Sequence, residues 1–289
     1  MPRSFKAKKK RLCSPRRSLP PFCHRNFYNY RELTTPQGFY TMADLKRRTL
    51  EGVGRVYFSE EHDRFLPSVT TVLDQRPKPK ALKKWQERND GEGDTPHWRD
   101  IMNFKSYRGT LIHYNVLNQF ADEDIGGHNE EEAEEELKKG TGYGNWQDYK
   151  PANHWATNSF ERIANQRGIT HESVLNVECF VQNTDIGYAG QFDLLYIDGD
   201  GDVVLSDLKT SARVYDKHKM QLTAYREAVP LKIDKLEVIR LHPDSETAEV
   251  SHDSDWLEDP NELFEEFVDL RESMNEDLSR IKEHGVDDG

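Results

Sequence analysis

The chain has 289 residues, of which 40 are Lys or Arg and 52 are Asp or Glu, so its formal net charge is −12. Hydrophobic residues make up 35% of the chain, enough for one core, which excludes wholesale disorder; the length predicts one or two domains. No apolar run approaches the roughly 18 residues of a membrane span, and no apolar signal segment follows the N-terminus, so we expect an intracellular protein without membrane contact.

The N-terminal segment 1–31 contains ten basic residues and no acidic one, which predicts a disordered basic tail. Such a tail could contact nucleic acid, address the protein to a nucleus or an organelle, or be only a solvated extension. Cysteines occur only at positions 13, 23 and 179, without a Cys-x-x-Cys pair. We therefore expect no disulfide framework, no iron–sulfur cluster and a reducing compartment, such as the cytoplasm of a cell or of a virus-infected host.

We interpret residues 32–289 as a single domain. Its N-terminal half is predicted to contain a strand at 54–58 and helices at 79–89, 99–120 and 152–167. Ser68 could cap a further helical turn, Gly109 suggests a break in the second helix, and Gly168 is a plausible end of the third. Residues 121–150 are predicted to form an acidic surface insertion.

The hydrophobic period then changes to that of strands. Strands are predicted at 172–182, 186–197, 202–209 and 235–242, with helices at 215–228 and 259–283, the last one acidic. The sequence Asp198-Gly-Asp-Gly201 predicts a hairpin turn between the second and third strands. This order indicates an α/β (α+β) fold with a central mixed sheet flanked by helices.

The strongest chemical signal lies on the two strands of this hairpin. Asp207 and Lys209 are two residues apart, so their side chains share one face of a strand. The turn is centred between Asp193 and Asp207, which brings these two carboxylates together. Paired carboxylates suit a hard divalent cation, and a neighbouring lysine can orient water or stabilise charge on a phosphate. Ordinary strand polarity would also produce an isolated Asp-x-Lys.

Four further positions could belong to the same group. Gln221 and Tyr225 share one face of the next helix, where they could contact the lysine region or a nucleic-acid backbone, or form an ordinary half-buried surface. His113 could be a core histidine or could reach the carboxylates from the earlier helix. Glu178 could line the same face, or could be a half-buried strand residue that bonds to the helix of Gly109.

Taken together, these motifs resemble the PD-(D/E)xK nuclease superfamily in its RecB-like exonuclease branch. That branch has a G-x-x-x-H helix, a strand glutamate, G-x-x-D, a (D/E)-x-K strand and Q-x-x-x-Y on the following helix. The matching residues stand in the same order, as Gly109…His113, Glu178, Gly190…Asp193, Asp207…Lys209 and Gln221…Tyr225. The segment Leu66–Leu73 and the pair Leu82…Trp85 are similar to the entry of phage and archaeal exonucleases and of the mitochondrial genome maintenance exonuclease.

The resemblance covers about residues 54–242 and implies a restriction-endonuclease-like core. It implies that Mg²⁺ or Mn²⁺ is bound by His113, Asp193, Asp207 and the carbonyl of Leu208. Lys209 becomes the catalytic lysine, with Glu178 in the catalytic set. Gln221, Tyr225 and Ser68 become candidates for organising the site or binding nucleic acid. The four cluster-binding cysteines of CRISPR-associated relatives are missing, and the acidic insertion and acidic C-terminal helix have no assigned counterpart.

We therefore expect a metal-dependent exonuclease that degrades DNA from single-stranded ends in replication, recombination or repair, with DNA and possible replication or recombination proteins as partners. One alternative is a structure-selective endonuclease on the same fold. Another is a nuclease-like module that binds nucleic acid without cutting it.

Overall fold

The structure is a computed structural model that describes residues 45–92, 95–121, 125 and 146–274. All of these residues belong to one compact unit, Met42–Gly289. The predicted tail at 1–31, most of the acidic insertion at 121–150, and the end of the helix predicted at 259–283 lie outside the described residues. The prediction of a single domain over 32–289 therefore stays a prediction.

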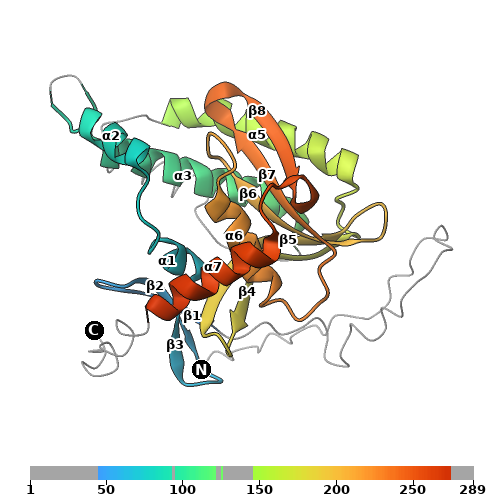
Figure 1. Ribbon diagram of the computed structural model, residues 1–289. Coiled ribbons are helices and arrows are strands. Elements are labelled where there is room, and N and C mark those ends of the chain that lie inside the picture. Colours follow the sequence, from blue (N-terminus) through green and yellow to red (C-terminus); the bar gives the residue numbers. More distant parts are fainter. Residues whose placement is uncertain (1–44, 93–94, 122–124, 126–145, 275–289) are drawn as a thin grey trace, which may run out of the picture. The chain divides into compact units, whose positions relative to one another are not determined.

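The described residues form the following elements (Figure 1). The strands are β1 (Leu45–Leu50), β2 (Gly54–Ser59), β3 (Arg64–Pro67), β4 (Val174–Asn183), β5 (Tyr188–Ile197), β6 (Val203–Lys209), β7 (Lys235–His242) and β8 (Thr247–His252). The helices are α1 (Val69–Leu73), α2 (Lys80–Arg88), α3 (Trp98–Leu117), α5 (Trp146–Arg167), α6 (Asp216–Arg226) and α7 (Pro260–Ser273), with short 3-10 turns η2 (Asn118–Phe120), η3 (Pro243–Ser245) and η4 (Asp253–Asp255). No helix in this described part is long and apolar enough to cross a membrane.

The main sheet has five strands in the order β4-β5-β6-β7-β8. The pair β6–β7 is parallel, and the other three pairs are antiparallel. A parallel pair needs a crossover, which α6 supplies between β6 and β7. The sheet is therefore mixed, and the predicted α+β class is confirmed.

Helices cover both faces of this sheet (Figure 1). On one face, α1, α6 and α7 enclose a core that includes Phe192, Leu205 and Phe267. On the other face, α3 and α5 pack over a second core that includes Phe160 and Leu208. Alternating strand positions supply the two cores, because successive side chains of a strand point to opposite faces.

A small antiparallel sheet, β1-β2-β3, precedes the main sheet. It packs against the main sheet through a third core, in which Leu45, Tyr57 and Leu66 contact Ala189 and Phe180. The chain then enters α1 at Ser68, whose side chain accepts a hydrogen bond from the amide of Thr71 at 3.0 Å. The predicted cap at Ser68 is confirmed.

Most of the predicted elements are confirmed within two or three residues, and the strand at 235–242 has the predicted bounds. The structure adds β1, β3 and β8, and it extends α5 back to Trp146. The predicted break at Gly109 is wrong, because α3 continues through it. Gly109 is buried, and a Cβ atom there would lie 3.0 Å from Thr210 Oγ1, so this glycine allows close packing instead of ending the helix.

The predicted turn at Asp198–Gly201 joins β5 to β6. Gly201 adopts a φ of +89°, and Asp198 Oδ1 accepts hydrogen bonds from the amides of Asp200 and Asp202. Lys235 of β7 lies beside the turn, with its Nζ 2.7 Å from carboxylate oxygens of both Asp198 and Asp202. One lysine therefore neutralises the acidic turn and ties it to the neighbouring strand.

A buried carboxylate also lies on β7, the strand that follows the crossover helix α6. Glu237 of β7 has no exposed surface and receives hydrogen bonds from Ser206 on the adjacent strand β6 and from Tyr196 on β5. Arg167 Nη2, at the end of α5, lies 2.8 Å from Glu237 Oε2. This ion pair attaches α5 to the sheet.

Replacement of Glu237 by alanine should destabilise the fold strongly, because it leaves Arg167 without its carboxylate and removes the acceptor of two buried hydroxyls. We expect a loss of about 3 kcal/mol in the free energy of unfolding, measured by urea denaturation. Glu249→Ala is the control, since Glu249 pairs with Arg240 but is half exposed, and it should cost less than about 1 kcal/mol. Similar losses in both variants would contradict the structural role of Glu237.

Candidate metal centre

The centre lies where β5 and β6 separate. Their ladder ends at the pair Leu194–Ser206, so Asp193 and Asp207 lie just beyond its last pair. There the carboxylate of Asp193 takes over the role of a strand partner, and its Oδ2 accepts a hydrogen bond from the amide of Leu208 at 2.6 Å. The predicted proximity of the two strand carboxylates thus follows from the register of the hairpin.

Glu178 of β4 lies opposite Asp193, between the pairs Val177–Leu194 and Cys179–Phe192. Its φ is +47°, a left-handed conformation that is unusual for a residue with a side chain. The alternation of the strand is interrupted here, because Val177 and Cys179 pack into opposite cores of the sheet. Phe192 and Leu194 show the same interruption around Asp193.

His113 of α3 completes the group. Its Nδ1 lies 3.6 Å from Asp193 Oδ2, and ligand atoms of His113, Glu178 and Asp193 all lie within 4.8 Å of one another. A group of one imidazole and two carboxylates in this arrangement could bind a metal ion. The structure therefore brings the predicted His113 together with the carboxylates, and it favours the interpretation in which Glu178 lines the same site.

Asp207 and Lys209 form a buried ion pair beside this group. Lys209 Nζ lies 2.5 Å from Asp207 Oδ2, as expected for two residues on one face of β6. The other oxygen of this fully buried carboxylate, Oδ1, accepts no hydrogen bond among the described residues. A buried carboxylate oxygen is costly without a partner, and a bound cation would satisfy it. The residues present therefore fit a metal ion.

Burial and mutual repulsion alter the proton affinities of the whole group. Burial, together with the charges of Asp193 and Asp207, raises the pKa of Glu178 to about 8. Burial likewise raises the pKa of Asp207 to about 6, against the opposing effect of Lys209. Burial and the charge of Lys209 lower the pKa of His113 to about 4, although a hydrogen bond to the Leu208 backbone opposes the shift. At neutral pH the His113 imidazole is therefore neutral, which is the form that can bind a metal ion.

Helix α6, which carries the predicted Gln221 and Tyr225 pair, borders the site. Gln221 Nε2 donates a hydrogen bond to Tyr225 Oη at 2.9 Å, as their shared helix face predicts. The ring of Tyr225 packs on Gly190, where a Cβ atom would lie 2.4 Å from the ring. The lack of a side chain at Gly190 thus lets the Tyr225 ring pack directly on β5, close to Asp193.

Ser68 also borders the site, but its hydroxyl is engaged by the α1 cap and by Thr70 and Thr71. This gives Ser68 a structural role; its predicted contact with nucleic acid stays a prediction.

Most of the predicted site residues line one cavity of about 790 Å³. Its lining includes His113, Glu178, Asp193, Lys209, Gln221 and Tyr225, so it joins residues that are far apart in the sequence. Sequence reasoning missed the rest of its wall, which includes Arg47, Arg55, Tyr57, Lys105 and Phe180. The alternation of β1 and β2 could have placed Arg47 and Arg55 on faces of strands, but nothing in the sequence indicated which cavity those faces border.

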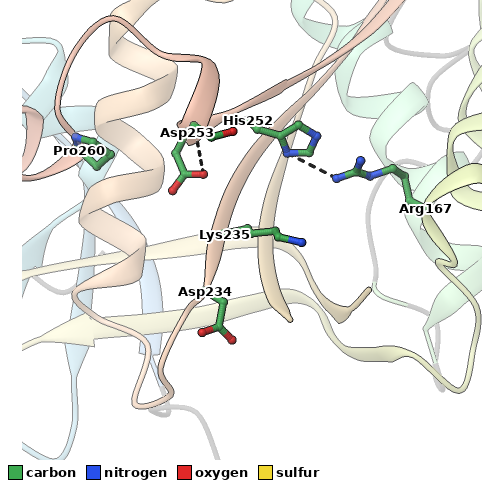
Figure 2. Close-up of a pocket in the computed structure, with 7 residues that line it drawn as sticks. Arg167, Asp234, Lys235, His252, Asp253 and Pro260 are labelled. Atoms are coloured by element: carbon green, nitrogen blue, oxygen red, sulfur yellow. Dashed lines mark hydrogen bonds between the residues drawn. The ribbon is translucent and has the colours of Figure 1, made fainter. Parts of the chain in front are cut away.

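A second cavity, of about 560 Å³, lies elsewhere and contains none of the predicted site residues. Figure 2 shows its wall, where Arg167 from α5 points toward His252 at the end of β8, with Lys235 below them. Both cationic side chains already have carboxylate partners, Glu237 for Arg167 and the acidic turn for Lys235. This cavity is therefore a less suitable site for an anionic ligand than its charge suggests.

Comparisons with known proteins do not assign a family. No protein-family model matches the chain, and no curated protein matches it. Among solved structures, the crystal structure of SSO0001 is similar at 19% sequence identity, with a TM-score of 0.28; the match covers 44% of this chain and 61% of that one. Neither fold nor function is inferred from a superposition this weak, so the candidate site depends on its own geometry.

Replacement of Gly190 by alanine should push Tyr225 off the strand. Overpacking of this kind costs about 1–3 kcal/mol, which thermal or urea unfolding would report. Gly199→Ala is a matched control, because a Cβ atom there would meet nothing within 4 Å. If the two variants were equally stable, the close contact between Gly190 and Tyr225 would not be needed.

The metal-free protein should lose stability as the pH rises from 6.5 to 8.5. Glu178 has a higher pKa in the folded chain, about 8, than its ordinary value of 4.5, so its contribution to stability is full at low pH and is lost as pH rises through 8. Folded His113, with a pKa of about 4, is neutral throughout this range. Its imidazole in the unfolded chain loses a proton near pH 6.5, so His113 adds only a small rise in stability at the start of the range.

The decline should disappear in Glu178→Gln and persist in Glu87→Gln, a substitution on the exposed surface of α2. Melting temperatures in EDTA provide the measurement. Added Mn²⁺ should protect the wild type more at pH 8.5 than at 6.5, since carboxylates bind metal after losing their proton. A flat wild-type profile in EDTA would refute the assignment of a protonated Glu178.

Proposed function

We propose that this protein is a metal-dependent DNA nuclease that hydrolyses phosphodiester bonds, acting as an exonuclease on single-stranded ends. The observation that carries the proposal is the convergence of His113, Glu178, Asp193 and Lys209 in one cavity that also has arginines on its wall. Asp207 lies buried behind this cavity and pairs with Lys209. The five sequence motifs that resemble RecB-like nucleases supply these same residues. The agreement between the motifs and the cavity supports the proposal.

The ligand chemistry favours Mg²⁺ or Mn²⁺. Carboxylate oxygens are the ligands of hard divalent ions, and one imidazole is compatible with Mn²⁺. His113, Glu178 and Asp193 would hold the ion, with Asp207 beside them. A bound ion of this type polarises a phosphate oxygen and lowers the pKa of a coordinated water.

The protein's own groups would carry the remaining tasks. Lys209 is fixed by Asp207, and the charges of Asp207 and Asp193 overcome burial and raise the pKa of this lysine, so it stays an ammonium. An ammonium in this position can orient the attacking water and stabilise negative charge that develops on the phosphate. Gln221 and Tyr225, which are joined by a hydrogen bond, would support the strand or the substrate at the cavity wall.

Asp207→Asn and Lys209→Met should each reduce degradation of end-labelled linear single-stranded DNA in Mg²⁺ or Mn²⁺ by about 100-fold or more, since each removes a charge from the reacting centre. Asp253→Asn, in the second cavity, is the control and should keep wild-type activity.

Equal activity of all four proteins would overturn the catalytic assignment. Circular single-stranded DNA distinguishes the mode of action, because an exonuclease leaves it intact and an endonuclease on the same fold opens it. Binding without turnover in both metals would favour the non-catalytic module.

A further inference from the structure

Part of the wall of the cavity that holds the metal-binding residues is formed by the small sheet. Arg47 of β1 and Arg55 of β2 both border the cavity, and so does Tyr57. Arg47 is paired in register with Tyr57, and Arg55 precedes Tyr57 by two residues, so the three side chains lie on one face of the small sheet. This face is the one that Leu45, Tyr57 and Leu66 turn toward the main sheet.

The position of this wall is fixed. The ring of Tyr57 contacts that of Phe180 edge to face, with centroids 5.6 Å apart, and Phe180 belongs to β4, two residues after Glu178. This ring contact holds the strands that carry Arg47 and Arg55 against the strand that carries Glu178.

Neither arginine forms an ion pair with a carboxylate within the described ranges, whereas Arg108, Arg167 and Arg240 each do. Diagonal neighbours on an antiparallel pair have Cβ atoms about 7–8 Å apart, close enough for two guanidinium groups to repel. An anion between or across the two groups would relieve that repulsion. A planar guanidinium matches phosphate oxygens particularly well.

We propose that Arg47 and Arg55 form a binding site for two phosphates of a nucleic-acid strand that flank the phosphate at the metal centre. The inference rests on the proposed function for its ligand, a single polynucleotide strand. In this arrangement the guanidinium groups come from the small sheet, whereas the carboxylates and His113 come from the main sheet and α3. A strand bound this way presents its backbone to the arginines while one phosphodiester reaches Lys209.

Arg48 provides a matched control. It is the next residue of β1 and carries the same charge, but the alternation of the strand points it away from the cavity, and it does not line it. Arg47→Lys is a second control, which keeps the charge and loses the fork of donors.

The test is the binding of a fluorescein-labelled single-stranded DNA oligonucleotide, followed by anisotropy in EDTA over a series of salt concentrations. Arg47→Ala and Arg55→Ala should each weaken binding about tenfold, and the double variant should lower the slope of log K against log salt by about 1.4, or about 0.7 for each phosphate that is no longer neutralised. Arg48→Ala should bind like the wild type, Arg47→Lys should lie between the two, and all variants should melt at the wild-type temperature.

Equal affinity and equal salt slope for Arg47→Ala and Arg48→Ala would overturn the inference, as would absence of binding by the wild type. Because EDTA prevents hydrolysis, the result is independent of catalysis. If Arg47→Ala weakens DNA binding but the wild type never cleaves DNA, the phosphate-binding site stands and the proposed nuclease activity is refuted. If the wild type cleaves DNA but Arg47→Ala and Arg48→Ala bind equally well, the nuclease activity stands and the phosphate-binding site is refuted.

Discussion

The hydrogen bond from the Leu208 amide to Asp193 Oδ2 is the contact around which the candidate centre is arranged. It forms where the ladder between β5 and β6 stops, so a side chain replaces the backbone partner that β6 would otherwise lose. The same short segment of β6 then carries Asp207 and Lys209 and meets His113 through the Leu208 backbone. One side-chain-to-backbone contact thus fixes the strand end, the ion pair and the helix relative to each other.

The centre is electrostatically expensive as it stands. Three carboxylates lie close together, Asp193 and Asp207 buried and Glu178 half-buried, and the ammonium of Lys209 is fixed beside them. The protein tolerates this by holding protons at raised pKa values and by anchoring Asp193 to a backbone amide. Raised pKa values combined with a backbone hydrogen bond that anchors one carboxylate are typical of a group that can exchange its protons for a cation.

The sequence predicted the hairpin and the Asp207–Lys209 pair correctly because period-two alternation and turn chemistry are local properties. It left open whether Glu178 lines the site. Glu178 itself has a left-handed backbone conformation, which interrupts the strand alternation on which such a prediction depends. The sequence placed a helix break at Gly109 because the glycine's role, close packing against Thr210, depends on a residue that follows β6 about a hundred positions later. The strand β1 was missed because four of its six residues are exposed, so it lacks an apolar pattern. The wall that it forms depends on tertiary packing.

The acidic turn between β5 and β6 has a consequence for handling the protein. Its aspartates at positions 198, 200 and 202 have the spacing that calcium loops use, but the ammonium of Lys235 already lies between them. A divalent ion would have to displace a tethered cation from its own counter-charges. Chelators and calcium buffers should therefore leave this turn unchanged.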